Sequence, residues 1–134
     1  MGIEATLLIV KPDGVRRALI GEILRRVEAK GLVIERLELR TIDRATAEEH
    51  YAEHRQKPFF GELVSFVTSG PSVLARITGE DAIGCWRTMM GPTNPVDAPP
   101  GSIRGDLATV ITENIVHGSD SPASAERELR LFFG

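Results

Sequence analysis

Apolar and polar side chains alternate along the chain with periods that predict short strands separated by helices. Residues 5–10, Ala-Thr-Leu-Leu-Ile-Val, form an apolar run that stops at Lys-Pro-Asp-Gly, as is typical of a buried strand followed by a turn. The next apolar side chains follow helical spacing and include Leu19, Ile20, Ile23, Leu24 and Val27. Gly31 is the expected end of that helix, and residues 32–42 alternate as a half-exposed second strand.

The second part of the chain continues this alternation. Thr46-Ala-Glu-Glu49 matches a capping box and predicts a helix from there to about Arg55. The remaining segments predict a short helix at 60–68, a strand at 71–77, a helix at 81–90 and a last strand at 114–117. Ser121-Pro122 is an N-cap followed by proline, and it opens a final helix to about Phe132. Residues 91–106 hold four prolines and three glycines and predict a long functional loop.

This order of elements is a repeated split βαβ unit, with a pair of helices inserted between the second and third strands. The expected fold class is α/β (α+β). The expected architecture is a ferredoxin-like sandwich, in which helices pack on a four-stranded antiparallel sheet. A length of 134 residues corresponds to a single domain spanning 1–134.

Composition narrows the class of protein further. Apolar residues make up 42%, charged residues 26%, and the net charge is −3, which argues against nucleic acid as the primary partner. The longest uncharged run, 63–75, is shorter than the roughly 20 residues of a membrane span, and Glu4 argues against a secretory signal. Cys85 is the only cysteine, so no internal disulfide forms and a reducing cytoplasm is the expected location.

One segment matches a metal-binding motif. His50-Tyr-Ala-Glu-His54 fits H-x-x-E-H, the inverted zinc-peptidase pattern, and helical spacing would place both histidines on one face. The alternative is an exposed helix with incidental histidines. The glycine-rich phosphate loops, the dinucleotide-binding glycine motif and the serine-hydrolase elbow are all missing from the sequence.

The segment 114–121, Asn-Ile-Val-His-Gly-Ser-Asp-Ser, carries the clearest chemistry. His117 is expected at the end of a strand, next to a helix start whose free amides favour a phosphate. Glu128, in the following helix, could accept the second ring N–H of this histidine and fix one tautomer. The other ring nitrogen would then be a nucleophile. The alternative is a structural histidine with satisfied hydrogen bonds.

Basic side chains accompany this segment. Arg87, Thr93 and Arg104 flank the proline-rich loop and could offer bidentate donors and a hydroxyl to a polyphosphate, or could be a solvated surface. Lys11 follows a buried strand and could neutralise a phosphate, or could be only the solvent-exposed end of that strand. Phe59 and Phe60 follow Pro58, so one is expected in the core and the other as a stacking surface.

Six blocks in order resemble the nucleoside diphosphate kinase family. They lie at 8–15, 50–60, 68–71, 91–95, 100–106 and 114–121, and the resemblance runs from about Thr6 to Phe132. It implies a ferredoxin-like fold and transfer of a γ-phosphoryl from a nucleoside triphosphate to a nucleoside diphosphate. The implied route is a ping-pong cycle through a phosphohistidine. Mg²⁺ is the implied cofactor, bound through the nucleotide phosphates and not by protein ligands.

The resemblance also implies roles for individual residues. His117 is the implied nucleophile, Glu128 orients it, and Gly118 and Ser119 support it. The implied phosphate and ribose contacts come from Lys11, Arg87, Thr93, Arg104 and Asn114. The implied cleft wall consists of Tyr51 and His54, with Phe59 stacking on the base, Leu63 beside it and Ile111 near the base. The family forms hexamers and tetramers, and we expect a homo-oligomer, with a hexamer favoured over a tetramer.

Two other classes of function remain as alternatives. One is a ferredoxin-like regulatory module that binds a nucleotide without catalysis. Such a module would not need the pair of His117 and Glu128 together with three side chains that donate hydrogen bonds to phosphates. The other is a small metallopeptidase built on H-x-x-E-H, which would hold zinc tightly.

Overall fold

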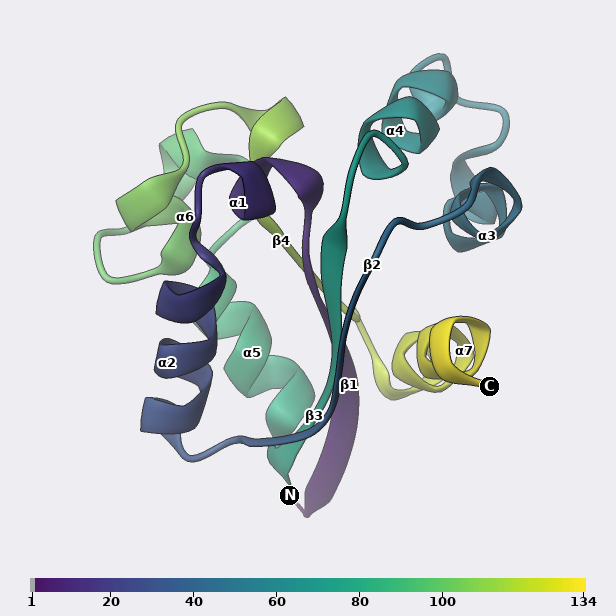
Figure 1. Cartoon of the computed structure of the whole chain (residues 1–134). Coiled ribbons are helices and arrows are strands. Elements are labelled where there is room, and N and C mark those ends of the chain that lie inside the picture. The colour runs from purple at the N-terminus through teal and green to yellow at the C-terminus, as the bar shows by residue number, and fades with distance from the viewer. Residues whose placement is uncertain (1) are drawn as a thin grey trace.

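The computed structural model describes residues 2–134 as a sheet with helices on both of its faces (Figure 1). In chain order, the strands are β1 (Ile3–Val10), β2 (Val33–Arg40), β3 (Ser72–Glu80) and β4 (Val116–Gly118). The α-helices are α1 (Pro12–Arg16), α2 (Ile20–Lys30), α3 (Arg44–His50), α4 (Phe60–Val67), α5 (Ala82–Met90), α6 (Ile103–Leu107) and α7 (Pro122–Phe133). Three short 3₁₀ turns are η1 (Ala52–His54), η2 (Pro95–Asp97) and η3 (Ile111–Glu113).

The four strands lie in the order β2-β3-β1-β4, and each neighbouring pair is antiparallel. This is the predicted four-stranded antiparallel sheet with ferredoxin-like connections. The strand β1 lies inside the sheet, where Ile9 pairs with His117 of β4 on one side and Leu74 of β3 on the other. The pairing of β1 with β4 therefore connects the candidate histidine directly to a strand whose last five residues are buried.

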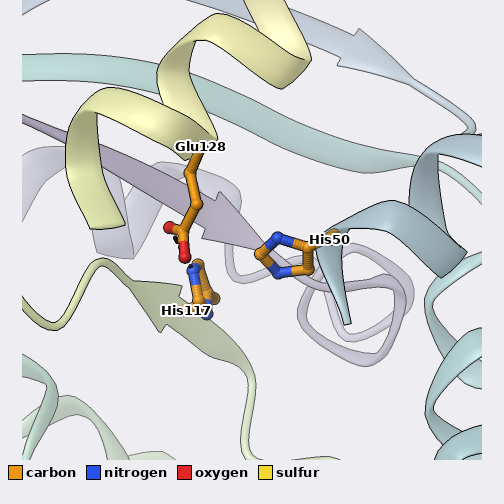
Figure 2. Close-up of side chains that lie close together, drawn as sticks. All are labelled: His50, His117 and Glu128. Atoms are coloured by element: carbon orange, nitrogen blue, oxygen red, sulfur yellow. Dashed lines mark hydrogen bonds and ion pairs between the residues drawn. The ribbon is translucent and has the colours of Figure 1, made fainter. Parts of the chain in front are cut away.

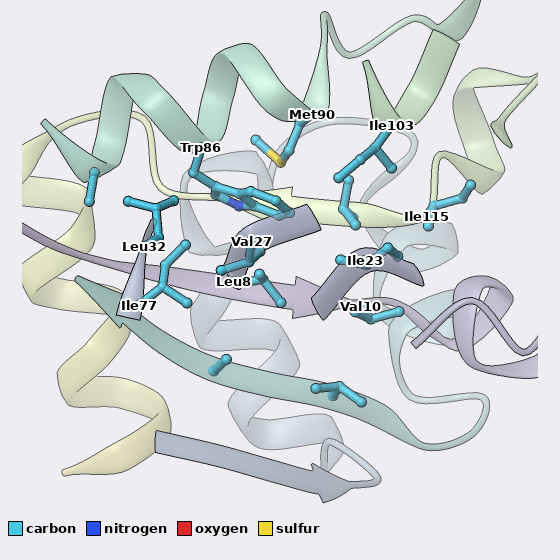
Figure 3. Packing of buried hydrophobic residues seen from close by; sticks show 14 of the residues in the cluster. Leu8, Val10, Ile23, Val27, Leu32, Ile77, Trp86, Met90, Ile103 and Ile115 are labelled. Atoms are coloured by element: carbon cyan, nitrogen blue, oxygen red, sulfur yellow. The ribbon is translucent and has the colours of Figure 1, made fainter. Parts of the chain in front are cut away.

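The apolar run of β1 has no polar alternation because both faces of the sheet are covered. Leu8 and Val10 face the core formed with α2 and α5, whereas Leu7 and Ile9 face a second core beneath α3, α4 and α7. Figure 3 shows the first core, in which the fully buried Trp86 of α5 packs among the aliphatic side chains. The edge strand β2 is more exposed to solvent than the predicted half-exposed strand. Its apolar side chains Val33, Leu37 and Leu39 are each at least 50% exposed.

Local signals in the chain account for several element boundaries. Gly31 ends α2 in the left-handed conformation, and the Ser121 side chain accepts a hydrogen bond from the amide of Ser124 at the start of α7, as predicted. Among residues 2–134, the structure contains no helix long and apolar enough to cross a membrane.

Two boundary predictions around the third helix were wrong. The N-cap of α3 is Asp43, not Thr46, because the Asp43 carboxylate accepts from the amide of Thr46 at 3.1 Å and from its hydroxyl at 2.7 Å. The helix ends at His50, and η1 follows in place of a continuous helix to Arg55. His50 and His54 therefore do not share one helix face.

Three further segments differ from expectation. The turn predicted after β1 is the short helix α1, which starts with Pro12 in a position where a helix needs no amide donor. The long loop 91–106 contains η2 and the first turns of α6, with Ser102 as the N-cap of α6. The last strand starts at Val116, because Ile115 adopts a positive φ and leaves the strand conformation.

Candidate active site

A cavity of about 220 Å³ opens where the end of β1, the segment α3–η1, the loop after α5 and the start of β4 meet. Residues far apart in the sequence line it together. Those that the sequence analysis singled out are Lys11, Tyr51, His54, Arg87, Thr93, Arg104, Asn114, His117, Gly118 and Glu128. The structure thus brings the predicted nucleophile, its carboxylate partner and the side chains predicted to bind phosphates together around one cavity.

His117 and Glu128 both line this cavity and lie next to each other (Figure 2). His117 Nε2 lies 2.9 Å from Glu128 Oε1, and the other ring nitrogen, Nδ1, points away from the carboxylate. Burial raises the pKa of Glu128, but hydrogen bonds and charge from His117 and a hydrogen bond from Ser119 outweigh it and lower the pKa to about 2. The carboxylate is therefore ionised at neutral pH. It accepts a hydrogen bond from Nε2–H, and this tautomer leaves a lone pair on Nδ1.

Two neighbours of His117 hold this pair in place. The buried Ser119 hydroxyl donates to Glu128 Oε1 at 2.8 Å, so Ser119 acts on the carboxylate and does not line the cavity. Gly118 is packed so closely that a Cβ there would lie 2.5 Å from Trp86 Cδ1. The Trp86 indole N–H donates to the carbonyl of His117 at 3.2 Å. Only glycine at 118 lets the strand lie this close to α5.

His50 also lines the cavity, and the sequence analysis did not place it next to His117. Its ring packs edge-on against the ring of His117, with 4.7 Å between the centroids, and against Tyr51 and Phe132. Burial and the nearby His117 lower the pKa of His50 to about 3, so this ring is neutral. The Nδ1 atom of His50 is buried and has no hydrogen-bond partner in residues 2–134. The available signal was the helical spacing that places His50 on the same face as Ala47, the other buried residue of α3.

In residues 2–134, one cluster of side chains could bind a metal ion, and it is not the pair of histidines in the H-x-x-E-H motif. His50, His117 and Glu128 each place one ligand atom within 4.8 Å of the others. Because His117 and Glu128 are hydrogen-bonded to each other, a metal ion there would have to break that hydrogen bond. His54 belongs to η1 and lines the cavity.

The half-buried Lys11 and the buried Arg104 supply positive charge to the cavity. Lys11 Nζ donates to Asn114 Oδ1 at 3.0 Å, and burial, followed by the charge of Arg104, lowers the pKa of Lys11 to about 8. Arg104 donates to the backbone carbonyls of Asn114, Gly91 and Val116 at 3.2, 2.9 and 2.7 Å. Burial, with the charge of Arg87, lowers its pKa to about 10. Arg104 is therefore charged but also organises the backbone around the site, which sequence spacing did not predict.

Arg87 and Thr93 lie nearer the mouth of the cavity. Arg87 is ion-paired with the exposed Asp120, which also lines the cavity. The sequence analysis assigned no role to Asp120 beyond its place in the segment 114–121. The carbonyl of Thr93 accepts from Asn114 Nδ2 at 3.0 Å, which orients the Asn114 side chain between Lys11 and the loop. A phosphate that binds Arg87 must compete with the Asp120 carboxylate.

The residues predicted to contact the base are Phe59, Leu63 and Ile111. In the described part of the chain, none of the three lines this cavity. Phe59 is 44% exposed and its ring lies 5.7 Å from that of His54, so an aromatic face borders the cavity wall. Leu63 is half-buried on α4, and Ile111 is 52% exposed in η3. Glu53, Met90, Gly91 and Pro92 also line the cavity.

Comparison with known proteins finds relatives over nearly the whole chain. The family profile described as nucleoside diphosphate kinase matches residues 4–134. The nucleoside diphosphate kinase of Rubrobacter xylanophilus is 63% identical over 131 residues, 98% of each chain. That of Deinococcus radiodurans is 58% identical over 98% of this chain and 95% of the relative.

Solved structures agree with this result. The nucleoside diphosphate kinase of Halobacterium salinarum, in complex with CDP, superposes with a TM-score of 0.96 at 48% identity, over 98% of this chain and 88% of that one. The Aquifex aeolicus enzyme gives 0.96 at 42% identity, over 99% and 96%.

Proposed function

The chain belongs to the nucleoside diphosphate kinase family and has that activity, and from this premise we propose that His117 Nδ1 carries the phosphoryl group between nucleotides. The observation that carries the proposal is the 2.9 Å contact between His117 Nε2 and Glu128 Oε1. An ionised carboxylate at Nε2 keeps the proton there and leaves Nδ1 unprotonated. We further propose that the chain forms a single nucleoside diphosphate kinase domain. Membership of this family favours the kinase over the regulatory module and the metallopeptidase.

The proposed cycle has two half-reactions. In the first, the Nδ1 lone pair attacks the γ-phosphorus of a nucleoside triphosphate. The bond from that phosphorus to the β,γ-bridging oxygen breaks, and the diphosphate leaves with the bond electrons. In the second, a terminal β-phosphate oxygen of another diphosphate attacks the phosphorus, and the N–P bond breaks to restore the ring. Glu128 stays ionised and stabilises the positive charge that the ring carries while phosphorylated.

The phosphates are the groups that this cavity fits best. Lys11, Arg87 and Arg104 provide positive charge, and Thr93 can add a hydroxyl. Of the two other carboxylates in the lining, Asp120 is paired with Arg87 and Glu53 lies 3.8 Å from His54 Nε2. This donor set suits Mg²⁺ that is coordinated by phosphate oxygens. When bound in this way, Mg²⁺ supplies charge neutralisation on the phosphates.

The nucleoside is proposed to extend from the phosphates toward the rim. Asn114 and Lys11 are hydrogen-bonded to each other and are placed to contact the ribose. Phe59 offers an exposed ring for the base, with Leu63 and Ile111 as apolar neighbours. The relative from Halobacterium salinarum was solved with CDP, which supports a nucleoside diphosphate as the substrate class here.

We also propose a homo-oligomer, with a hexamer favoured over a tetramer, and a cytoplasmic location. The exposed apolar side chains of the edge strand β2, at Val33, Leu37 and Leu39, support an association of subunits that covers them. The single cysteine supports a reducing compartment.

The decisive test is incubation of the protein with γ-labelled ATP. We expect label on the protein that is acid-labile and base-stable, as a phosphohistidine is, and release of the label to added GDP as GTP. His117→Ala should abolish labelling and turnover while the protein still binds ADP, since Lys11 and Arg87 provide the phosphate contacts. Substantial turnover by that variant would show direct transfer between nucleotides and would refute the phosphohistidine.

A further inference from the structure

The backbone between η3 and β4 contains a strained turn. Ile115 has φ of 74°, and the N–H of Val116 donates to the carbonyl of Asn114 at 2.8 Å. These two features define a γ-turn centred on Ile115, in the rarer and strained of its two forms. A β-branched residue at positive φ is an outlier because its Cβ substituents crowd the backbone. Such a turn persists only where its surroundings hold it.

The side chain of Ile115 explains why glycine does not occupy this position. It is fully buried in the core that α2 and α5 form on the sheet, where it lies close to Val10 and Ile23 (Figure 3). Glycine would relax the backbone but leave a cavity in that core. The molecule therefore keeps an aliphatic side chain in an unfavourable backbone conformation immediately before the strand that carries His117.

Three neighbouring residues hold the backbone of this turn. Asp13 Oδ2 accepts the amide of Ile115 at 3.1 Å, and the amide of Lys11 donates to the carbonyl of Ile115 at 2.7 Å. Arg104 donates to the carbonyls on either side of Ile115, those of Asn114 and Val116. The only side-chain acceptor in this set is Asp13, so the direction of the Ile115 amide depends on that carboxylate.

The buried carboxylate of Asp13 is only partly satisfied by hydrogen bonds. The residue is 3% exposed, and its Oδ1 has no hydrogen-bond partner in residues 2–134. A buried carboxylate with an unpartnered oxygen is costly, and such groups call for an explanation. At the next residue, Gly14, a Cβ would lie 3.0 Å from Ile115 Cγ2 and 2.8 Å from Val10 Cγ1, so α1 is pressed directly against the turn.

We propose that Asp13 is a positioning residue for phosphoryl transfer, because its carboxylate maintains the γ-turn that places Asn114 and His117 relative to each other. The turn joins two functional side chains. Before it, Asn114 bridges Lys11 Nζ and the carbonyl of Thr93, each at 3.0 Å. After it, β4 delivers His117 to the cavity. Relaxation of the turn would shift one of these side chains against the other, and a displacement of about 1 Å in an active site costs roughly 10²-fold in rate.

This inference rests on the proposed role of His117, and its test separates the two. Asp13→Asn keeps an oxygen that can accept the Ile115 amide, whereas Asp13→Ala removes it. Glu28→Gln, the same carboxylate-to-amide change at an exposed position of α2, is the control. Single-turnover mixing with ATP measures the rate of phosphohistidine formation. Trp86 is the only tryptophan in the sequence, and its indole N–H is hydrogen-bonded to the His117 carbonyl. Its intrinsic fluorescence therefore serves as a reporter of the reaction at His117.

The expected ranking follows from the acceptor that each variant retains. The phosphorylation rate should fall about 10-fold in Asp13→Asn and about 10²-fold in Asp13→Ala, with ADP affinity and the thermal unfolding transition close to those of the Glu28→Gln control. Wild-type rates in both Asp13 variants would overturn the proposal. So would losses of rate that merely follow a loss of ADP affinity or of folded protein. Failure of the wild-type protein to form an acid-labile phosphate would instead refute the role of His117.

Discussion

Replacing Glu128 by glutamine removes the charge next to the proposed nucleophile and keeps the shape of the side chain. Glu128 Oε1 accepts from both His117 Nε2 and Ser119 Oγ, at 2.9 and 2.8 Å. A hydrogen bond to a charged group contributes about 1.5–3 kcal/mol, against about 0.5–1.5 kcal/mol for a neutral one. For the bond to His117, the corresponding ends of these two ranges differ by about 1–1.5 kcal/mol when the phosphorylated ring is positive, which corresponds to a loss in kcat of roughly 5-fold to 13-fold.

The assay is steady-state kcat with ATP and a diphosphate acceptor, across the neutral pH range. Because the pKa of Glu128 is about 2, the wild-type carboxylate stays ionised throughout, and the deficit of Glu128→Gln should not vary with pH. Glu126→Gln is the matched control: Glu126 lies on the same helix, is exposed and pairs only with Arg130 among the interactions found. Its loss should leave kcat unchanged. A Glu128→Gln variant with wild-type kcat at every pH in this range would remove Glu128 from the mechanism.

Three further measurements test the electrostatics and the base site. With the pKa of Lys11 lowered to about 8, kcat/KM should fall as pH rises through about 8, and Lys11→Arg should move that decline to higher pH; a flat wild-type profile would contradict this role. The folded-state pKa of Glu128 lies below its ordinary 4.5, so its contribution to the free energy of unfolding is complete above pH 4.5 and is lost as pH falls toward 2. Acid unfolding followed by circular dichroism should therefore show less pH dependence across that range in Glu128→Gln than in wild type. Since Phe59 offers a flat face and no base-edge contacts, purine and pyrimidine, ribo- and deoxyribo-diphosphates should differ by no more than about 10²-fold in kcat/KM. Phe59→Ala should affect purines most, and a preference of about 10⁴-fold for one base would reveal hydrogen-bond readout.

The local elements of the fold were predictable because their signals lie within a few residues of one another. The apolar run of β1, the helix end at Gly31 and the cap at Ser121 each depend on neighbouring side chains and backbone. The same holds for the proposed pair of His117 and Glu128, since one follows the other across a strand end and the next helix. The order of these elements then restricted the sheet to a small set of topologies, of which the predicted one was confirmed.

Other features of the site depend on contacts between distant segments. His50 meets the ring of His117 only because α3 packs over the sheet face that α7 also covers. Arg104 was expected at phosphates, but its burial turns three donors toward backbone carbonyls that no sequence spacing identifies. Ile115 reads as a strand residue from its β-branched side chain, yet Asp13 and the surrounding core hold it at a positive φ. The sequence by itself determined the elements, their order and the chemistry available, because those follow from local periodicity and residue type. The tertiary structure alone decided which buried polar groups meet, because each must find a partner among segments that only packing brings together.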